Sequence, residues 1–297
     1  MSHKKLRLSW PLEIEIVRGY VNWALSVRRL SPETVKVYLS DLKMAHKIRN
    51  IEASFENDYF INAMIKGAKN ISLYSSICKR SRFVMSFPLL KLLGHEIATS
   101  DWSQDSKSVF WTACCVAFFG SFRLGEILPK SDGQDPETLS WNQIKFSKNG
   151  SVVINIRFPK VIRDVSGDFV DLFEIKNSSF CPFSALKHLS TLRASITDPN
   201  RPVFQFANGK NLTQRIFSST VVSLLERHVG GEAKNFSGHS FRAAIPSALA
   251  NTPDLASDSD IMMWGRWSSE SYKCYTRLKH NARKAIFEKI VSMYSSQ

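Results

Sequence analysis

The sequence predicts a mainly α-helical protein of two domains, with a small antiparallel β-sheet in the second domain. Apolar residues recur at helical spacing along most of the chain, whereas only the segment 130–175 contains β-branched stretches typical of strands. The length agrees, because 297 residues fit two domains of ordinary size, or one large one. A polar, turn-prone stretch at 98–106 is the predicted linker, and it divides the chain into residues 1–102 and 103–297.

The first predicted domain is all-helical, because no stretch of it alternates as a strand does. Its best-marked helix begins after Ser31, whose hydroxyl can cap the helix, and at Pro32, which suits the first helical position. Val35, Leu39 and Leu42 form an apolar stripe on this helix. The other helices of this domain are predicted at residues 10–30, 56–68 and 84–94.

Basic side chains of the first domain are candidates for binding a polyanion. Three lysines of the second helix line up beside its apolar stripe, as in a helix that lies against DNA phosphates, although such a row can also be an ordinary solvated face. A basic turn follows the third helix. The candidate DNA-binding residues are Lys36, Lys43, Lys47, Lys79, Arg80 and Arg82.

The second predicted domain opens with a strongly apolar helix at 107–119. The β-branched stretches 151–158 and 169–173 are predicted strands, joined by a turn. Pro246 is unexpectedly early in its helix and is expected to kink or delay it. Further helices are predicted at residues 182–194, 213–229, 240–250, 258–264 and 281–294.

The composition favours a nucleic-acid partner. The formal net charge is +14 at pH 7, and residues 1–100 hold 16 Lys and Arg against 8 Asp and Glu. Adjacent Cys114 and Cys115 lie in an apolar stretch and are predicted core residues, and the five cysteines have no metal-site spacing. The sequence has no Rossmann, Walker or HExxH motif and no apolar run near 18 residues. We therefore expect an intracellular protein that binds no membrane and no metal.

Side chains of the second domain could hold and attack a phosphodiester. Cleaving DNA through a side-chain nucleophile requires an attacking group, cations that stabilise the phosphorane, and an acid that protonates the leaving 5′ oxygen. Two arginines, a lysine, a histidine, a tryptophan and a tyrosine provide these functions. The candidate catalytic residues are Arg123, Lys160, His239, Arg242, Trp267 and Tyr275.

Each candidate has a chemical role. The planar forks of Arg123 and Arg242 suit bidentate binding of phosphate, and His239 lies three residues before Arg242, on the same helix face. Trp267 offers an indole N–H to the same phosphate. Tyr275 is the predicted nucleophile, which would leave a 3′ phosphotyrosine link. The remaining residue, Lys160, is the predicted general acid, with Lys176 and Arg163 as competitors for that role.

Three strings carry a family resemblance: FRLGEIL from residue 122, GHSFR from 238 and GRWSSESYKCYTR from 265. They resemble the arginine, His-x-x-Arg and tyrosine boxes of the tyrosine recombinases, which include the phage integrases. The last string is most similar to eukaryotic transposon-borne members of the DIRS, Ngaro and Crypton type. In this resemblance Glu126 is the acidic residue of the first box and orients its neighbours.

The resemblance implies a two-domain DNA clamp, with a helical, SAM-like core-binding domain and an integrase-type catalytic domain. It implies site-specific cleavage and exchange of double-stranded DNA strands, without a cofactor, for integration or excision of a mobile element. A homo-oligomer, dimer to tetramer, is expected on DNA, and the helix at 281–294 would dock either on its own domain or on a neighbouring protomer. The location would be nuclear, or cytoplasmic in a prokaryotic source.

Alternatives remain at the level of the sequence. Trp267 and Tyr275 are eight residues apart, one fewer than the commonest bacterial spacing, so Tyr272 is a rival nucleophile. A domesticated DNA-binding protein that no longer cuts would keep the same motifs. A type IB topoisomerase shares the chemistry but needs no dedicated target sequence.

Overall fold

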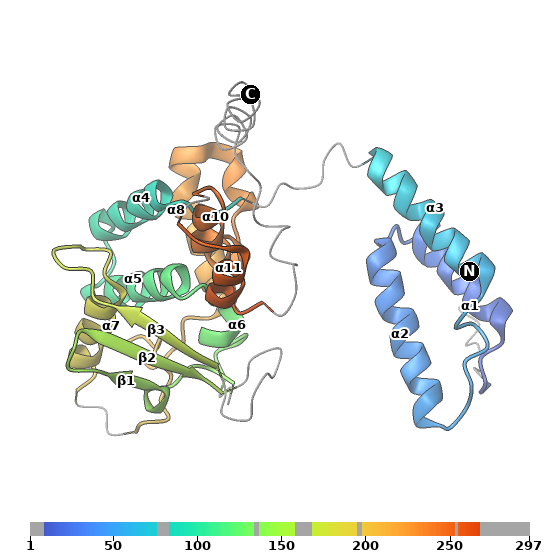
Figure 1. Cartoon of the computed structure of the whole chain (residues 1–297), viewed down its shortest axis with the longest axis horizontal. Coiled ribbons are helices and arrows are strands. Elements are labelled where there is room, and N and C mark those ends of the chain that lie inside the picture. The colour runs from blue at the N-terminus through green and yellow to red at the C-terminus, as the bar shows by residue number, and fades with distance from the viewer. Residues whose placement is uncertain are drawn as a thin grey trace, which may run out of the picture. The chain divides into compact units, whose positions relative to one another are not determined.

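The computed structural model describes residues 9–75, 83–133, 137–157, 168–194, 198–252 and 255–267 (Figure 1). The chain forms two compact units, Met1–Ser81 and Arg82–Gln297. The division therefore lies upstream of the boundary expected at residue 102.

The first unit is built from three helices, α1 (Ile14–Ser26), α2 (Pro32–Ile48) and α3 (Tyr59–Ser75). The predicted start of α2 is confirmed, because the Ser31 hydroxyl accepts a hydrogen bond from the backbone N–H of Thr34 at 3.0 Å. The three helices enclose a small apolar core. Its most buried members include Val17, Val21, Ala24, Val35, Ile61 and Ile65.

A buried histidine fastens the chain before α1 to α2. His46 is fully buried, and its Nε2 accepts a hydrogen bond from the backbone N–H of Leu12 at 3.2 Å. Its Nδ1 lies 2.8 Å from the Leu42 carbonyl oxygen, to which it donates. Both ring nitrogens are thus used internally, which makes His46 a structural residue.

The helix α4 (Phe87–Thr99) belongs to the second unit, which corrects the predicted boundary. Its apolar stripe, Leu90, Leu93 and Ile97, lies in the same core as α5 (Gln104–Phe119). The backbone N–H of Met85 also donates to the carbonyl of Ser240 at 2.9 Å. The stretch at 98–106 thus includes the end of α4, a short turn and the start of α5, all within the second unit. An amphipathic pattern in the sequence indicates that a helix buries one face, but it does not indicate against which domain that face packs.

The sheet of the second unit is small and antiparallel, as predicted, with strand order β1–β2–β3. It comprises β1 (Ile144–Phe146), β2 (Ser151–Ile156) and β3 (Asp168–Phe173). Ile154 of β2 is paired with Ile144 of β1 and Val170 of β3. The strands β2 and β3 match the prediction, whereas β1, only three residues long, was not expected.

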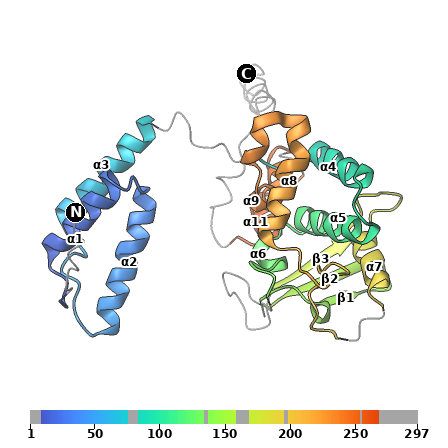
Figure 2. The same cartoon turned by 180° about the vertical axis from the view of Figure 1, so that it is seen from behind.

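Helices surround α5, which is buried along most of its length and includes Cys114 and Cys115, both fully buried. Figures 1 and 2 show α5 between α4 and the sheet.

None of the helices in the described part of the chain is long and apolar enough to cross a membrane. The other helices are α6 (Leu124–Ile127), α7 (Pro182–Leu192), α8 (Gln214–Val229), α9 (Gly238–Arg242), α10 (Ala244–Ala250) and α11 (Asp258–Gly265), with 3₁₀ turns at Trp141–Gln143 and Gly230–Asn235.

The helix predicted at 240–250 is divided into α9 and α10. Ala243 separates them, with ψ at −8°. The ring of Pro246 would clash with the carbonyl of the residue four positions earlier in a continuous helix, and that residue is Arg242. The break therefore lies where the proline requires it. The helix predicted at 281–294 lies outside the described residues.

Replacing Ser31 should test the cap of α2. Ser31→Ala removes the acceptor for the Thr34 amide and should cost about 1 kcal/mol of local stability, whereas Ser31→Asp should preserve the cap. Hydrogen exchange at the first amides of α2 would measure this loss. Equal exchange in the two variants would show that the cap contributes nothing.

Candidate functional site

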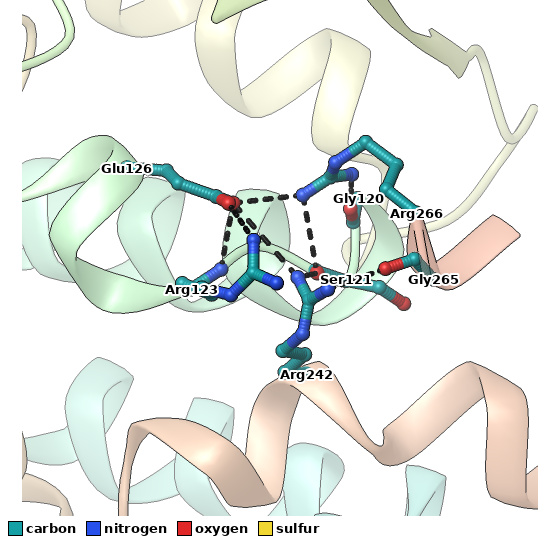
Figure 3. A network of polar contacts seen from close by, with 7 residues as sticks. All are labelled: Gly120, Ser121, Arg123, Glu126, Arg242, Gly265 and Arg266. Carbon is teal, nitrogen blue, oxygen red and sulfur yellow. Dashed lines mark hydrogen bonds and ion pairs between the residues drawn. The ribbon is translucent and has the colours of Figure 1, made fainter. Parts of the chain in front are cut away.

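Three arginines surround one carboxylate in the second unit (Figure 3). Arg123 is the N-cap residue of α6, and Arg242 is the last residue of α9. Arg266 follows the end of α11. The side chains meet around Glu126, which brings together segments that are far apart in the sequence.

Glu126 is the centre of this cluster and is only 6% exposed. Its Oε1 accepts from Nη1 of Arg123 at 2.6 Å, and its Oε2 accepts from the backbone N–H of Arg123 at 2.9 Å. Oε2 also accepts from Nη2 of Arg266 at 2.8 Å and lies 3.9 Å from Nη1 of Arg242. One carboxylate therefore caps α6 and orients three guanidinium groups.

The charges around Glu126 keep it ionised. Burial by itself raises the pKa of this carboxyl group. The positive charges of Arg266 and Arg242, with hydrogen bonds from Arg123, act in the opposite direction and prevail, so the pKa of Glu126 lies below its usual value. Burial lowers the pKa of Arg266, and Glu126 opposes that effect.

Arg242 is fixed in position by backbone carbonyl groups. It is 3% exposed, and its Nη1 donates to the Ser121 oxygen at 2.8 Å while Nη2 donates to the oxygen of Gly265. Its Cζ lies 5.0 Å from the centre of the Trp267 ring. By contrast, the side chain of Arg123 is 25% exposed.

Trp267 is a packing partner of Arg242 in the structure. The residue is 7% exposed and forms a small apolar cluster with Ile261. Gly265 makes room for it, since a Cβ at position 265 would lie 1.8 Å from Cζ3 of the indole. The predicted role of Trp267 as a donor to phosphate therefore stays a prediction.

The structure brings Arg123, Glu126, Arg242 and Trp267 together, as the sequence analysis expected of one site. His239 is exposed and lies in the first turn of α9, on the helix that carries Arg242. Lys176, the alternative general acid, is exposed beyond β3. The remaining predicted residues, Lys160 and Tyr275 with the rivals Arg163 and Tyr272, lie outside the described residues.

Arg266 is the member of the cluster that the sequence analysis missed. Within the Gly265-Arg266-Trp267 motif the predicted role fell to Trp267, whose indole N–H can donate to a phosphate. The sequence signal for Arg266 was spacing. Trp267 is eight residues before Tyr275, one fewer than the commonest bacterial spacing, whereas Arg266 is nine residues before that tyrosine.

The cluster carries more positive than negative charge. Three guanidinium groups face one carboxylate, so these four side chains hold a net charge of +2. Such a site suits an oxyanion, and arginine forks suit phosphate in particular. Within the described ranges, no group of three His, Cys, Asp or Glu residues could hold a metal ion.

Comparison with known proteins rests on structure. No protein-family model and no curated protein matches the sequence. The Tn1549 transposon integrase (residues 82–397) in complex with transposon right-end DNA is 13% identical, with a TM-score of 0.60 over 95% of this chain and 86% of that chain. The XerH site-specific recombinase bound to difH substrate is 15% identical, with a TM-score of 0.58 over 90% and 68%. This chain has the tyrosine recombinase fold. The predicted fold class is thereby confirmed.

Neutralising Glu126 should change how stability depends on pH. Because its pKa is lowered in the folded protein, the carboxylate stabilises the fold above the usual glutamate pKa, and this contribution is lost as pH falls through the lowered value. Glu126→Gln should therefore cost about 3 kcal/mol at neutral pH and flatten the acid-side dependence. Urea unfolding across this pH range measures both effects.

The matched control is Glu232→Gln, at an exposed carboxylate. Its unfolding curve should follow that of the original protein at every pH. If Glu126→Gln gave that same curve, the buried carboxylate would have no stabilising role.

Proposed function

We propose that this chain is a site-specific DNA recombinase that cleaves and rejoins strands through a 3′ phosphotyrosine link. The observation that carries the proposal is the cationic cluster of Arg123 and Arg242 on Glu126, in a chain with this fold. In the related structures the partner is DNA, and the net charge of +14 on this chain suits the same partner.

The proposed reaction is a transfer between two oxygen atoms at one phosphorus. The phenol oxygen of Tyr275 forms a bond to phosphorus, and the bond from phosphorus to the 5′ oxygen breaks. Lys160 gives its proton to that 5′ oxygen, while Arg123 and Arg242 stabilise the doubly charged phosphorane. The phenol proton passes to water or to His239 as the new bond forms; His239 can otherwise donate a hydrogen bond to a nonbridging oxygen. A second 5′ hydroxyl then reverses the step, so the reaction needs no energy source.

Binding would involve the first unit as well. Lys36, Lys43 and Lys47 are exposed on one side of α2, away from its buried stripe. Lys43 forms an ion pair with Glu56, which reduces its share of the positive charge. The other predicted contacts of this unit, at the basic turn of residues 79–82, lie outside the described residues. Phosphate contacts of this kind position the protein without reading sequence.

The biological role follows by resemblance. We infer integration or excision of a mobile element, in the nucleus if the element is eukaryotic, by a homo-oligomer assembled on DNA. The C-terminal helix expected at 281–294 is a candidate contact between protomers.

Tyr275→Phe should abolish covalent attachment to DNA and leave binding intact, because it removes only the attacking oxygen. The substrate is a pool of duplexes with random sequence around a nick, so that the released 5′ fragment diffuses away and traps the covalent complex. Denaturing gels measure attachment, and retention of DNA on a filter measures binding. Tyr272→Phe is the matched control and should attach as the original protein does.

Three outcomes separate the alternatives. Attachment by Tyr275→Phe but not by Tyr272→Phe would assign the nucleophile to Tyr272. Binding without attachment by the original protein would identify a DNA-binding protein that no longer cuts. Attachment that is independent of sequence, with relaxation of any supercoiled plasmid, would identify a topoisomerase.

A further inference from the structure

The side chain of Arg266 forms hydrogen bonds with the turn that joins α5 to α6 and with Glu126 of α6. Nη1 donates to the Gly120 oxygen at 2.8 Å, and Nη2 donates to Glu126 at 2.8 Å and to the Ser121 oxygen at 3.4 Å. The guanidinium also stacks on Phe122, with its Cζ 4.9 Å from the ring centre. The side chain is 8% exposed, so it is directed inward.

Arg266 shares an acceptor with each of the other two arginines (Figure 3). The Ser121 oxygen accepts from both Arg242 and Arg266, and the Glu126 carboxylate accepts from both Arg123 and Arg266. The groups that hold Arg123 and Arg242 are therefore themselves held by Arg266.

Two features of Arg266 are unfavourable for local stability. Arg266 has a φ of 52°, in the left-handed region that favours glycine. Its Nε is buried and has no hydrogen-bond partner among the described residues. A glycine would suit the backbone better, so the side chain is retained for its contacts and not for the turn.

We propose that Arg266 is a positioning residue that locks the Gly120–Ser121 turn and the Glu126 carboxylate to the end of α11, so that Arg123 and Arg242 face the phosphate. The part of this inference that concerns phosphate rests on the proposed function.

Two variants test the lock. Arg266→Gly relieves the backbone and removes the side chain, and Arg266→Lys keeps the charge but loses the fork. The first readout is hydrogen exchange at the Arg123 amide, which donates to Glu126. It should become about tenfold faster in Arg266→Gly, since Glu126 loses a charge-assisted partner. Arg227→Lys, at an arginine whose side chain is 79% exposed, should leave it unchanged.

The second readout is covalent attachment to the nicked duplex pool. Both variants should attach about 10- to 100-fold more slowly, as when a supporting contact of a site is removed, with little change in DNA binding. Arg266→Gly should also lose attachment at a higher pH on acidification, because the pKa of Glu126 rises with only Arg123 and Arg242 left to face it. Asp168 of β3 lies near Arg266 and is unchanged in both variants.

The two readouts fail separately. Unchanged exchange in Arg266→Gly would overturn the lock, and so would attachment at the original rate. If the original protein attaches to no duplex while exchange still accelerates, the proposed function fails and the lock stands. A final check is Glu126→Gln combined with Arg266→Gly, which should slow attachment less than the product of the single effects. Full additivity would show that Arg266 does not act through Glu126.

Discussion

The second unit depends on one buried carboxylate that is surrounded by arginines. Glu126 is the third residue of a helix of four residues, a length that could not persist without a strong cap. Its Oε2 also accepts from Arg266, which follows α11, and forms an ion pair with Arg242, the last residue of α9. A single ionised group thus stabilises a local turn and joins three distant segments. If the carboxylate made only one of these two sets of contacts, charge in the interior would be left uncompensated.

The packing around this centre leaves little freedom. Arg242 contacts the carbonyl oxygens of Ser121 and Gly265 and the indole of Trp267, and α5 is buried along most of its length. Close-packed interiors are sensitive to small changes in volume. The positions of the guanidinium groups are therefore determined by packing in the core and not by contacts at the surface. This rigidity is what a site needs when it must stabilise charge without rearranging.

Local chemistry made much of the fold predictable. Ser31 and Pro32 mark the start of α2, and β-branched residues mark β2, because those signals act within a few residues. The three residues of β1 were missed, since a strand so short has no pattern of its own. The domain to which α4 belongs was also misjudged, because that depends on a partner distant in the sequence.

The site could be predicted only for the residues that a sequence motif marks. Arg123 and Arg242 were expected together, and the structure brings them together. The part played by Arg266 depends on a left-handed backbone that turns its side chain inward, and no motif encodes that direction.

The placement of α4 has a practical consequence. A fragment that began at residue 103 would lack Leu90, Leu93 and Ile97 and would leave an apolar trough along α5 open to water. Such a fragment would tend to aggregate during expression. A shorter protein meant for crystallisation or spectroscopy should instead retain everything from Arg82 onward.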